Sequence, residues 1–174
     1  MSAEKQEKQE SFRMDVQIGT SDMFWFLMRH NYFSFGGVLG VAISLGCLIY
    51  LILTFQTNDT MTNTFLGIGA LVFTVIQPVQ LLSKAHRQIM KNPIFHEPMH
   101  YEINNKTLTI HYKEEKLDIE WANMYKVVET KKRIYLYVDT VHSYIFPKEA
   151  CKEQLPKFQA VLEQHFTTKK RRNR

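Results

Sequence analysis

Two long apolar runs dominate the hydrophobic pattern of the chain. They cover residues 32–55 and 65–82, and neither contains a charged residue. Because about 20 apolar residues in a helix cross the hydrocarbon core of a bilayer, we predict a two-helix transmembrane hairpin over residues 32–82. The loop between the runs has no Lys or Arg, whereas Arg29 precedes the first run and further cations follow the second. Lys and Arg favour the cytoplasmic side, so both termini are predicted to be cytoplasmic.

The residues before the hairpin divide into three short segments. Residues 1–11 are charged and rich in Gln, which predicts a disordered tail. From Phe12 to Ile18, apolar residues alternate with polar ones, the pattern of a half-buried strand. The apolar run from Met23 to Met28 then predicts an interfacial helix that leads into the first span. We therefore assign residues 12–31 to a cytoplasmic strand and an interfacial helix.

After the hairpin, a basic helical linker over residues 83–96 precedes a series of short alternating segments. Between Met99 and Pro147 the alternation predicts six strands, and the apolar face of the following segment predicts a C-terminal helix. Together with the early strand this makes about seven strands, so the hairpin interrupts one domain after its first strand. We expect an α+β domain over residues 97–166, an antiparallel β-sheet or barrel with the helix covering one open end, as in PH-like domains.

The charge of the chain is concentrated in a few places. The formal net charge is +5, and much of the excess lies beside the predicted spans and in the basic tail, residues 167–174. This distribution favours anionic lipid head groups over nucleic acid as a partner. The two cysteines, Cys47 and Cys151, cannot form a disulfide framework, which agrees with a reducing compartment.

Several residues of the predicted domain carry a family pattern. Trp121 opens a segment that ends in Glu129, an Ile-Tyr-Leu-Tyr strand follows, and Phe146, Pro147 and Lys148 precede the last helix. In this pattern, and in its two spans followed by one domain, the chain resembles the YcxB-like membrane proteins of bacteria over most of its length after Asp22. The resemblance implies a PH-like domain in the bacterial cytoplasmic membrane and implies no activity. By itself, the apolar pattern around Trp121 indicates a core anchor.

One motif formally matches a zinc protease. His96, Glu97 and His100 satisfy H-E-x-x-H, in which two histidines one helical turn apart bind zinc and the Glu activates water. Pro98 disfavours the helix that this arrangement needs. We therefore predict no metal, no cofactor and no enzyme activity, and keep a membrane zinc metallopeptidase as an alternative.

Small residues recur on one face of the first span. Gly36, Gly40 and Ser44 follow one another at four-residue steps, which allows two membrane helices to approach closely. We expect this face to pack against the second span of the same chain. The alternative is a homo-oligomer, in which the protein would be a small subunit of a membrane complex.

Two basic clusters are candidates for contact with lipid head groups. One is the turn that contains Lys131, Lys132 and Arg133, and the other is the tail with Lys169, Lys170, Arg171 and Arg172. Solvated surface charge is the alternative for both. The combined prediction is a two-pass membrane protein whose PH-like domain acts as a binding, scaffolding or regulatory module. Its expected partners are the bilayer and either anionic lipids or a membrane or cytoplasmic protein.

Overall fold

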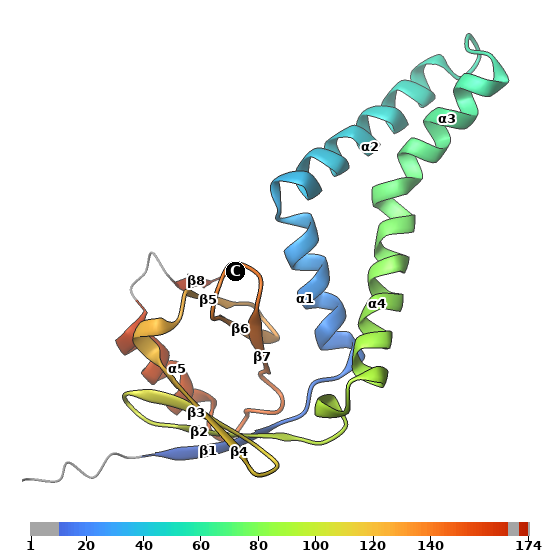
Figure 1. The fold of residues 1–174 in the computed structure, drawn as a ribbon. Coiled ribbons are helices and arrows are strands. Elements are labelled where there is room, and N and C mark those ends of the chain that lie inside the picture. The colour runs from blue at the N-terminus through green and yellow to red at the C-terminus, as the bar shows by residue number, and fades with distance from the viewer. Residues whose placement is uncertain (1–10, 167–170, 174) are drawn as a thin grey trace, which may run out of the picture. The chain divides into compact units, whose positions relative to one another are not determined.

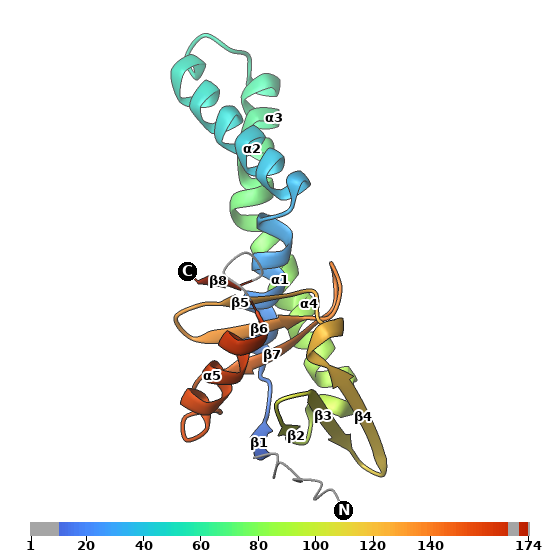
Figure 2. The same ribbon diagram turned by 90° about the vertical axis from the view of Figure 1, so that its left-hand side faces the viewer.

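The computed structural model describes residues 11–166 and 171–173, the last three by their backbone alone (Figure 1, Figure 2). The tails predicted over residues 1–11 and 167–174 therefore fall mostly outside the described residues. The described residues form two compact units, one made of residues 11–22, 92–166 and 171–173 and the other of Met23–Lys91.

The second unit is helical. Its elements are α1 Thr20–Tyr32 (which begins in the first unit), α2 Phe35–Thr54, α3 Thr60–Leu71, the π-helical segment η1 Val72–Ile76, and α4 Gln77–Lys91. Two helices are long and apolar enough to span a membrane: α2, and the 32-residue helix Thr60–Lys91 that α3, η1 and α4 form together. Only 17% and 11% of their most apolar windows are buried, so they are not enclosed as core helices of soluble proteins are. By length and composition they are two candidate membrane spans.

The first predicted span is interrupted near its start. The pattern predicts one helix over residues 32–55, but α1 ends at Tyr32 and α2 begins at Phe35. Ser34 explains the break, because its Oγ accepts a hydrogen bond from the backbone N–H of Gly37 at 3.0 Å, as an N-cap does.

The second span continues through a π-helical segment. A proline ring in a regular helix clashes with the carbonyl group four residues earlier. For Pro78 that residue is Thr74, which lies inside η1. The wider π-helical turn therefore accommodates Pro78 without ending the helix.

The small residues of α2 contact the second span within the chain. A Cβ atom built on Gly40 would lie 2.1 Å from the ring atom Cζ of Phe73, and Ser44 Oγ donates a hydrogen bond to the carbonyl oxygen of Gly69 at 2.8 Å. At Gly36, in contrast, a Cβ atom would meet nothing within 4 Å in the described part of the chain. Contact with the second span thus uses Gly40 and Ser44, and only Gly36 of the three remains open to a second copy.

The first unit contains two four-stranded sheets. The first has the order β1 Phe12–Val16, β2 Met99–Ile103, β3 Thr107–Tyr112 and β4 Glu115–Glu120, all antiparallel. The second has the order β7 Ser143–Pro147, β6 Arg133–Tyr137, β5 Lys126–Glu129 and β8 Arg171–Asn173, in which only the β5–β8 pair is parallel. The remaining elements are the 3₁₀-helices η2 Pro93–Phe95 and η3 Trp121–Asn123, and α5 Leu155–His165. Because β1 pairs with β2, the helical unit is inserted between two neighbouring strands of one sheet.

The seven antiparallel strands and the C-terminal helix agree with the prediction, but four details differ from what the sequence pattern predicts. The strands divide between two sheets, and β8 adds a parallel strand from the tail. Trp121 lies in η3 and not in a strand. The turn before β4 needs only two residues, since Lys113 adopts the left-handed conformation with φ 54°, so the strand begins at Glu115.

Aromatic side chains connect the elements of this unit. The ring centroid of Phe146 on β7 lies 4.8 Å from the ring centroid of Tyr101 on β2 and 4.9 Å from that of Phe158 on α5. All three side chains are fully buried. The core therefore joins one strand from each sheet to the C-terminal helix.

Candidate functional site

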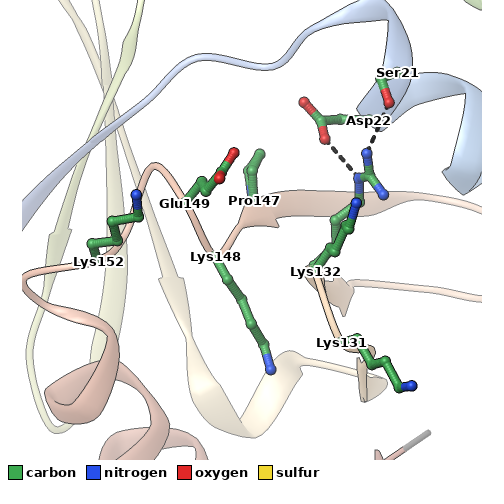
Figure 3. A pocket seen from close by; sticks show the side chains of 9 residues that line it. Ser21, Asp22, Lys131, Lys132, Pro147, Lys148, Glu149 and Lys152 are labelled. Carbon is green, nitrogen blue, oxygen red and sulfur yellow. Dashed lines mark hydrogen bonds and ion pairs between the residues drawn. The ribbon is translucent and has the colours of Figure 1, made fainter.

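A basic pocket lies at one end of the second sheet, within the first unit (Figure 3). Its volume is about 560 Å³, within the usual range for ligand sites. Three segments line it: the first turn of α1, the turn between β5 and β6, and the chain between β7 and α5. The lining residues are Ser21, Asp22, Lys131, Lys132, Arg133, Pro147, Lys148, Glu149 and Lys152. Five of these nine are Lys or Arg and two are acidic, so the pocket attracts anions.

A tight turn presents the first two lysines. Thr130 and Arg133 close the turn, because the N–H of Thr130 donates to the carbonyl oxygen of Arg133 at 2.8 Å. The Thr130 hydroxyl donates to the same carbonyl at 2.8 Å and accepts from the Arg133 N–H at 3.0 Å. Lys131 and Lys132 occupy the two central positions and are exposed. The backbone is thus held firmly while both side chains remain in solvent.

Arg133 connects this turn to the start of α1. Its Nε lies 2.6 Å from Asp22 Oδ1, and its Nη2 donates to Ser21 Oγ at 3.0 Å (Figure 3). The other oxygen of Asp22 accepts the backbone N–H of Gly19 at 3.0 Å, so this carboxylate also caps the helix. The two side chains of the ion pair are only 12% and 17% exposed. The Arg133 charge is therefore largely neutralised and serves to position the turn.

Lys148 is also bound within the protein. Its Nζ lies 2.7 Å from Glu129 Oε1, and Gln159 Nε2 on α5 donates to the same oxygen at 2.6 Å. The side chains of Lys148 and Glu129 are 22% and 10% exposed. Figure 3 shows the Lys148 side chain directed away from Glu149. Lys148 thus ties the end of β7 to β5.

Three lysines of the basic pocket are available to bind a ligand. In the described part of the chain, the amines of Lys131, Lys132 and Lys152 take part in no ion pair or hydrogen bond. All three are exposed at the pocket, together with the single carboxylate of Glu149. An ammonium group is a compact charge that suits a phosphate or carboxylate oxygen.

The comparisons with known proteins give one result that bears on this unit. Residues 103–162 match the YcxB-like protein family. This chain contains a YcxB-like domain. The match covers about a third of the chain, from the last residue of β2 into α5, and so leaves out β1 and both candidate spans. No curated protein and no solved structure matches the chain.

The predicted motif residues of the YcxB-like domain have structural contacts. Trp121 is 3% exposed, donates from Nε1 to the carbonyl oxygen of Asn104 at 2.9 Å and stacks on His165 at 5.7 Å. Phe146 is fully buried, and Pro147 lies opposite Arg133 in the β6–β7 pair. With the Glu129–Lys148 ion pair, these contacts place the motif in the packing of the domain and beside the basic pocket.

The H-E-x-x-H residues lie on different elements. His96 follows η2 and His100 lies on β2, so the two rings do not share a helical face, with Glu97 in the turn between them. His100 Nδ1 instead lies 2.6 Å from Asp15 Oδ1 on the neighbouring strand. Among the described residues, no three His, Cys, Asp or Glu side chains form a group that could hold a metal ion.

The second predicted basic cluster is only partly described. Lys169 and Lys170 lie outside the described residues, and Arg171 and Arg172 belong to β8, where the backbone pairs with β5. The side chains of these four residues lie outside the described part of the structure.

Sequence reasoning identified Lys131, Lys132 and Arg133 as a basic cluster. It named Pro147 and Lys148 only as motif residues, and it missed the remaining walls of the pocket. Asp22 lies just before the predicted interfacial helix and was given no role in a site, and Lys152 was not considered. Asp22 and Arg133 are 111 residues apart, so no local pattern joins them. The only signal was that Lys152 follows the Pro-Lys motif by four residues, near the predicted start of the last helix.

Proposed function

We propose that this protein is a two-pass protein of the bacterial cytoplasmic membrane whose YcxB-like domain binds phosphate-bearing anions. Both termini and the domain face the cytoplasm in this proposal. The flanking cations support this orientation, since Arg29 and Lys84 lie outside the two apolar runs and the loop between them has neither Lys nor Arg.

The observation that carries the proposal is the set of three lysines at the basic pocket. Lys131, Lys132 and Lys152 are exposed there, while the neighbouring cations Arg133 and Lys148 are engaged by carboxylates. A phosphate group bound in the basic pocket would gain charge-assisted hydrogen bonds from these amines without disturbing either ion pair. The ion pairs keep the turn and the end of β7 in place before a ligand arrives, which lowers the cost of binding.

A PH-like architecture belongs to the same proposal. It is supported by the seven antiparallel strands in two sheets and by α5, whose Phe158 packs on Phe146. In such a domain the connecting loops offer the binding surface, and the basic pocket is built from loops at one end of a sheet. We infer a binding, scaffolding or regulatory role from this arrangement of loops and cations.

The test is a calorimetric titration of the full-length protein in zwitterionic detergent micelles. Inorganic phosphate is the first titrant, and water-soluble dihexanoyl phosphatidylglycerol is the second. We expect saturable binding of at least one of them, weakened about a hundredfold in the triple variant K131Q/K132Q/K152Q, at about 1 kcal/mol per cation. The matched control K91Q/K106Q/K157Q removes the same charge from exposed positions away from the basic pocket.

The two titrants separate the sources of the phosphate group. Tighter binding of phosphatidylglycerol than of inorganic phosphate identifies a lipid head group, and the reverse identifies a free phosphorylated compound. Equal loss of binding in the triple variant and its control would overturn the proposal, because binding would then follow net charge alone. Absence of binding of either titrant to the wild-type protein would overturn it as well.

A further inference from the structure

A second pocket lies in the helical unit, next to the end of α1. Its volume is about 430 Å³, and its lining is mainly polar. The lining residues are Asn31, Gln77, Val79, Gln80, Leu81, Ser83, Lys84 and Arg87. It contains two cations, three side-chain amides and a hydroxyl, with no acidic group. Lys84 and Arg87 are exposed and take part in no ion pair within the described ranges 11–166 and 171–173.

The pairing of the two spans fixes the depth of this helical pocket. Gly40 lies against Phe73, and Ser44 is hydrogen-bonded to Gly69. The two helices are therefore antiparallel, and a residue four positions later in α2 faces a residue four positions earlier in the second span. Extending this relation places Pro78 level with Phe35, where α2 begins. The 20 residues of α2 make a helix of about 30 Å, the thickness of the hydrocarbon core.

Gln80 therefore lies about 3 Å beyond the hydrocarbon boundary, and Lys84 about 9 Å, at 1.5 Å per residue. The head-group region on each side of a bilayer is about 5–8 Å thick. Gln80 thus lies at the depth of the glycerol backbone, Lys84 just beyond the depth of the phosphate, and Arg87, nine residues after Pro78, about 14 Å beyond the hydrocarbon boundary. A flexible lysine side chain can reach back over the remaining distance.

One hydrogen bond joins two lining residues of the helical pocket, and a second lies next to it in the sequence. Gln77 Nε2 donates to Asn31 Oδ1 at 3.1 Å, and the Tyr32 hydroxyl donates to the carbonyl oxygen of Phe73. That carbonyl belongs to η1, where the π-helical turn disturbs the regular hydrogen-bond ladder. Both bonds join the end of α1 to the second span. The groove between them is therefore preformed, and π-helical segments often accompany functional sites.

We propose that this helical pocket binds one anionic phospholipid, such as phosphatidylglycerol, at the cytoplasmic surface. Lys84 and Arg87 hold its phosphate, and Gln80 and Ser83 hydrogen-bond its glycerol oxygens. The exposed apolar side chain of Val79 lies beside the acyl chains. Basic pockets between membrane helices on the cytoplasmic side are suited to such head groups. The inference depends on the membrane location of the two spans, but not on ligand binding by the YcxB-like domain.

Native mass spectrometry of the full-length protein tests this site. The protein is delipidated in detergent and titrated with dioleoyl phosphatidylglycerol or, separately, dioleoyl phosphatidylcholine. We expect one phosphatidylglycerol to bind in preference to phosphatidylcholine. The variant K84Q/R87Q should lower this affinity about thirtyfold, which corresponds to about 1 kcal/mol for each cation.

Two control variants make the result specific. K91Q removes a cation from the same helix outside the helical pocket, and K131Q/K132Q/K152Q removes those of the basic pocket. Each variant should still bind one phosphatidylglycerol with the affinity of the helical pocket, whether or not the basic pocket binds a second anion. Equal affinity for the two lipids, or unchanged affinity in K84Q/R87Q, would overturn the proposal. Loss of the lipid only in K131Q/K132Q/K152Q would also overturn it, because the lipid would then bind in the basic pocket.

Discussion

The ion pair between Glu129 and Lys148 gives a sharp test of how the YcxB-like domain is held together. Replacing Lys148 by Met keeps the length of the apolar side chain and removes the ammonium group 2.7 Å from the Glu129 carboxylate. Gln159 can still donate to that carboxylate, since its Nε2 lies 2.6 Å from the same oxygen. The change therefore isolates the charge of one partner from most of the packing.

The exposure of the two side chains sets the expected loss of unfolding free energy. Breaking a fully buried ion pair by removal of one partner costs about 3–5 kcal/mol, and breaking an exposed one costs about 0–1 kcal/mol. The two side chains are 22% and 10% exposed, which places this pair toward the buried limit. With the remaining bond from Gln159, we expect Lys148→Met to lower the free energy of unfolding by about 2–3 kcal/mol.

A double-mutant cycle separates the pair from its surroundings. Glu129→Gln removes the carboxylate charge and can still hydrogen-bond Gln159, so the variant K148M/E129Q should lose less stability than the two single changes together. We expect a coupling free energy of about 1–2 kcal/mol. The control is Lys157→Met on the exposed side of α5, which should change stability by less than about 0.5 kcal/mol.

Urea denaturation of the full-length protein in detergent micelles provides the assay. The fluorescence of the buried Trp121 reports on the domain once Trp25, the other tryptophan, is replaced by Phe. If K148M behaves like K157M, or if the coupling free energy is below about 0.5 kcal/mol, the ion pair does not stabilise the domain as argued here.

Three further predictions concern other parts of the chain. Trp121→Phe should lower the stability of the domain by about 1–2 kcal/mol in a denaturation assay followed by circular dichroism, because it removes the hydrogen bond to Asn104; a neutral change would contradict this. Gly69→Cys should form a disulfide with Cys47 on mild oxidation, detected by mass spectrometry, because a Cβ at position 69 would lie 3.0 Å from Cys47 Sγ and 3.5 Å from its Cβ; the Gly67→Cys control, in open space, should not. Hydrogen bonds from two backbone N–H groups of the following turn lower the pKa of Asp139 from 3.8 to about 2. Its stabilising effect should be present above pH 4 and be lost as the pH falls towards 2, so the difference in stability between the wild type and Asp139→Ala should shrink over that range.

Periodic patterns made the main elements predictable. The two uncharged runs are long enough to predict two apolar helices, and the alternation from Phe12 to Ile18 indicated a strand although only residues 12–16 form it. The insertion of the hairpin after that strand followed from counting strands. These features depend on many residues at once, so one exception does not change them.

Features that depend on single residues were harder to predict. Ser34 interrupts the first span through one N-cap hydrogen bond, although serine is common inside apolar helices. Trp121 begins a 3₁₀-helix although its neighbours alternate as in a strand. The division into two sheets depends on which strands pair, and alternation specifies a face of a strand but not its neighbour.

The candidate site was predictable only where it is local. Lys131 to Arg133 form a basic run on a turn, which a sequence displays directly. Asp22 precedes the helical unit in the sequence and Arg133 follows it. The Asp22 carboxylate meets Arg133 only because β1 pairs with the later strand β2. Long-range contacts of this kind leave no mark in a single sequence.

The most direct test of the central claim is a site-resolved measurement of ligand binding by the lysines of the basic pocket. The lysines of the full-length protein in micelles are methylated with ¹³C, their NMR signals are assigned by single Lys→Arg variants, and inorganic phosphate is added. Saturable shifts are expected for Lys131, Lys132 and Lys152, with Lys106 and Lys157 unchanged. Shifts of equal size at all five lysines, or no shift at any of them, would show that the basic pocket does not bind the anion.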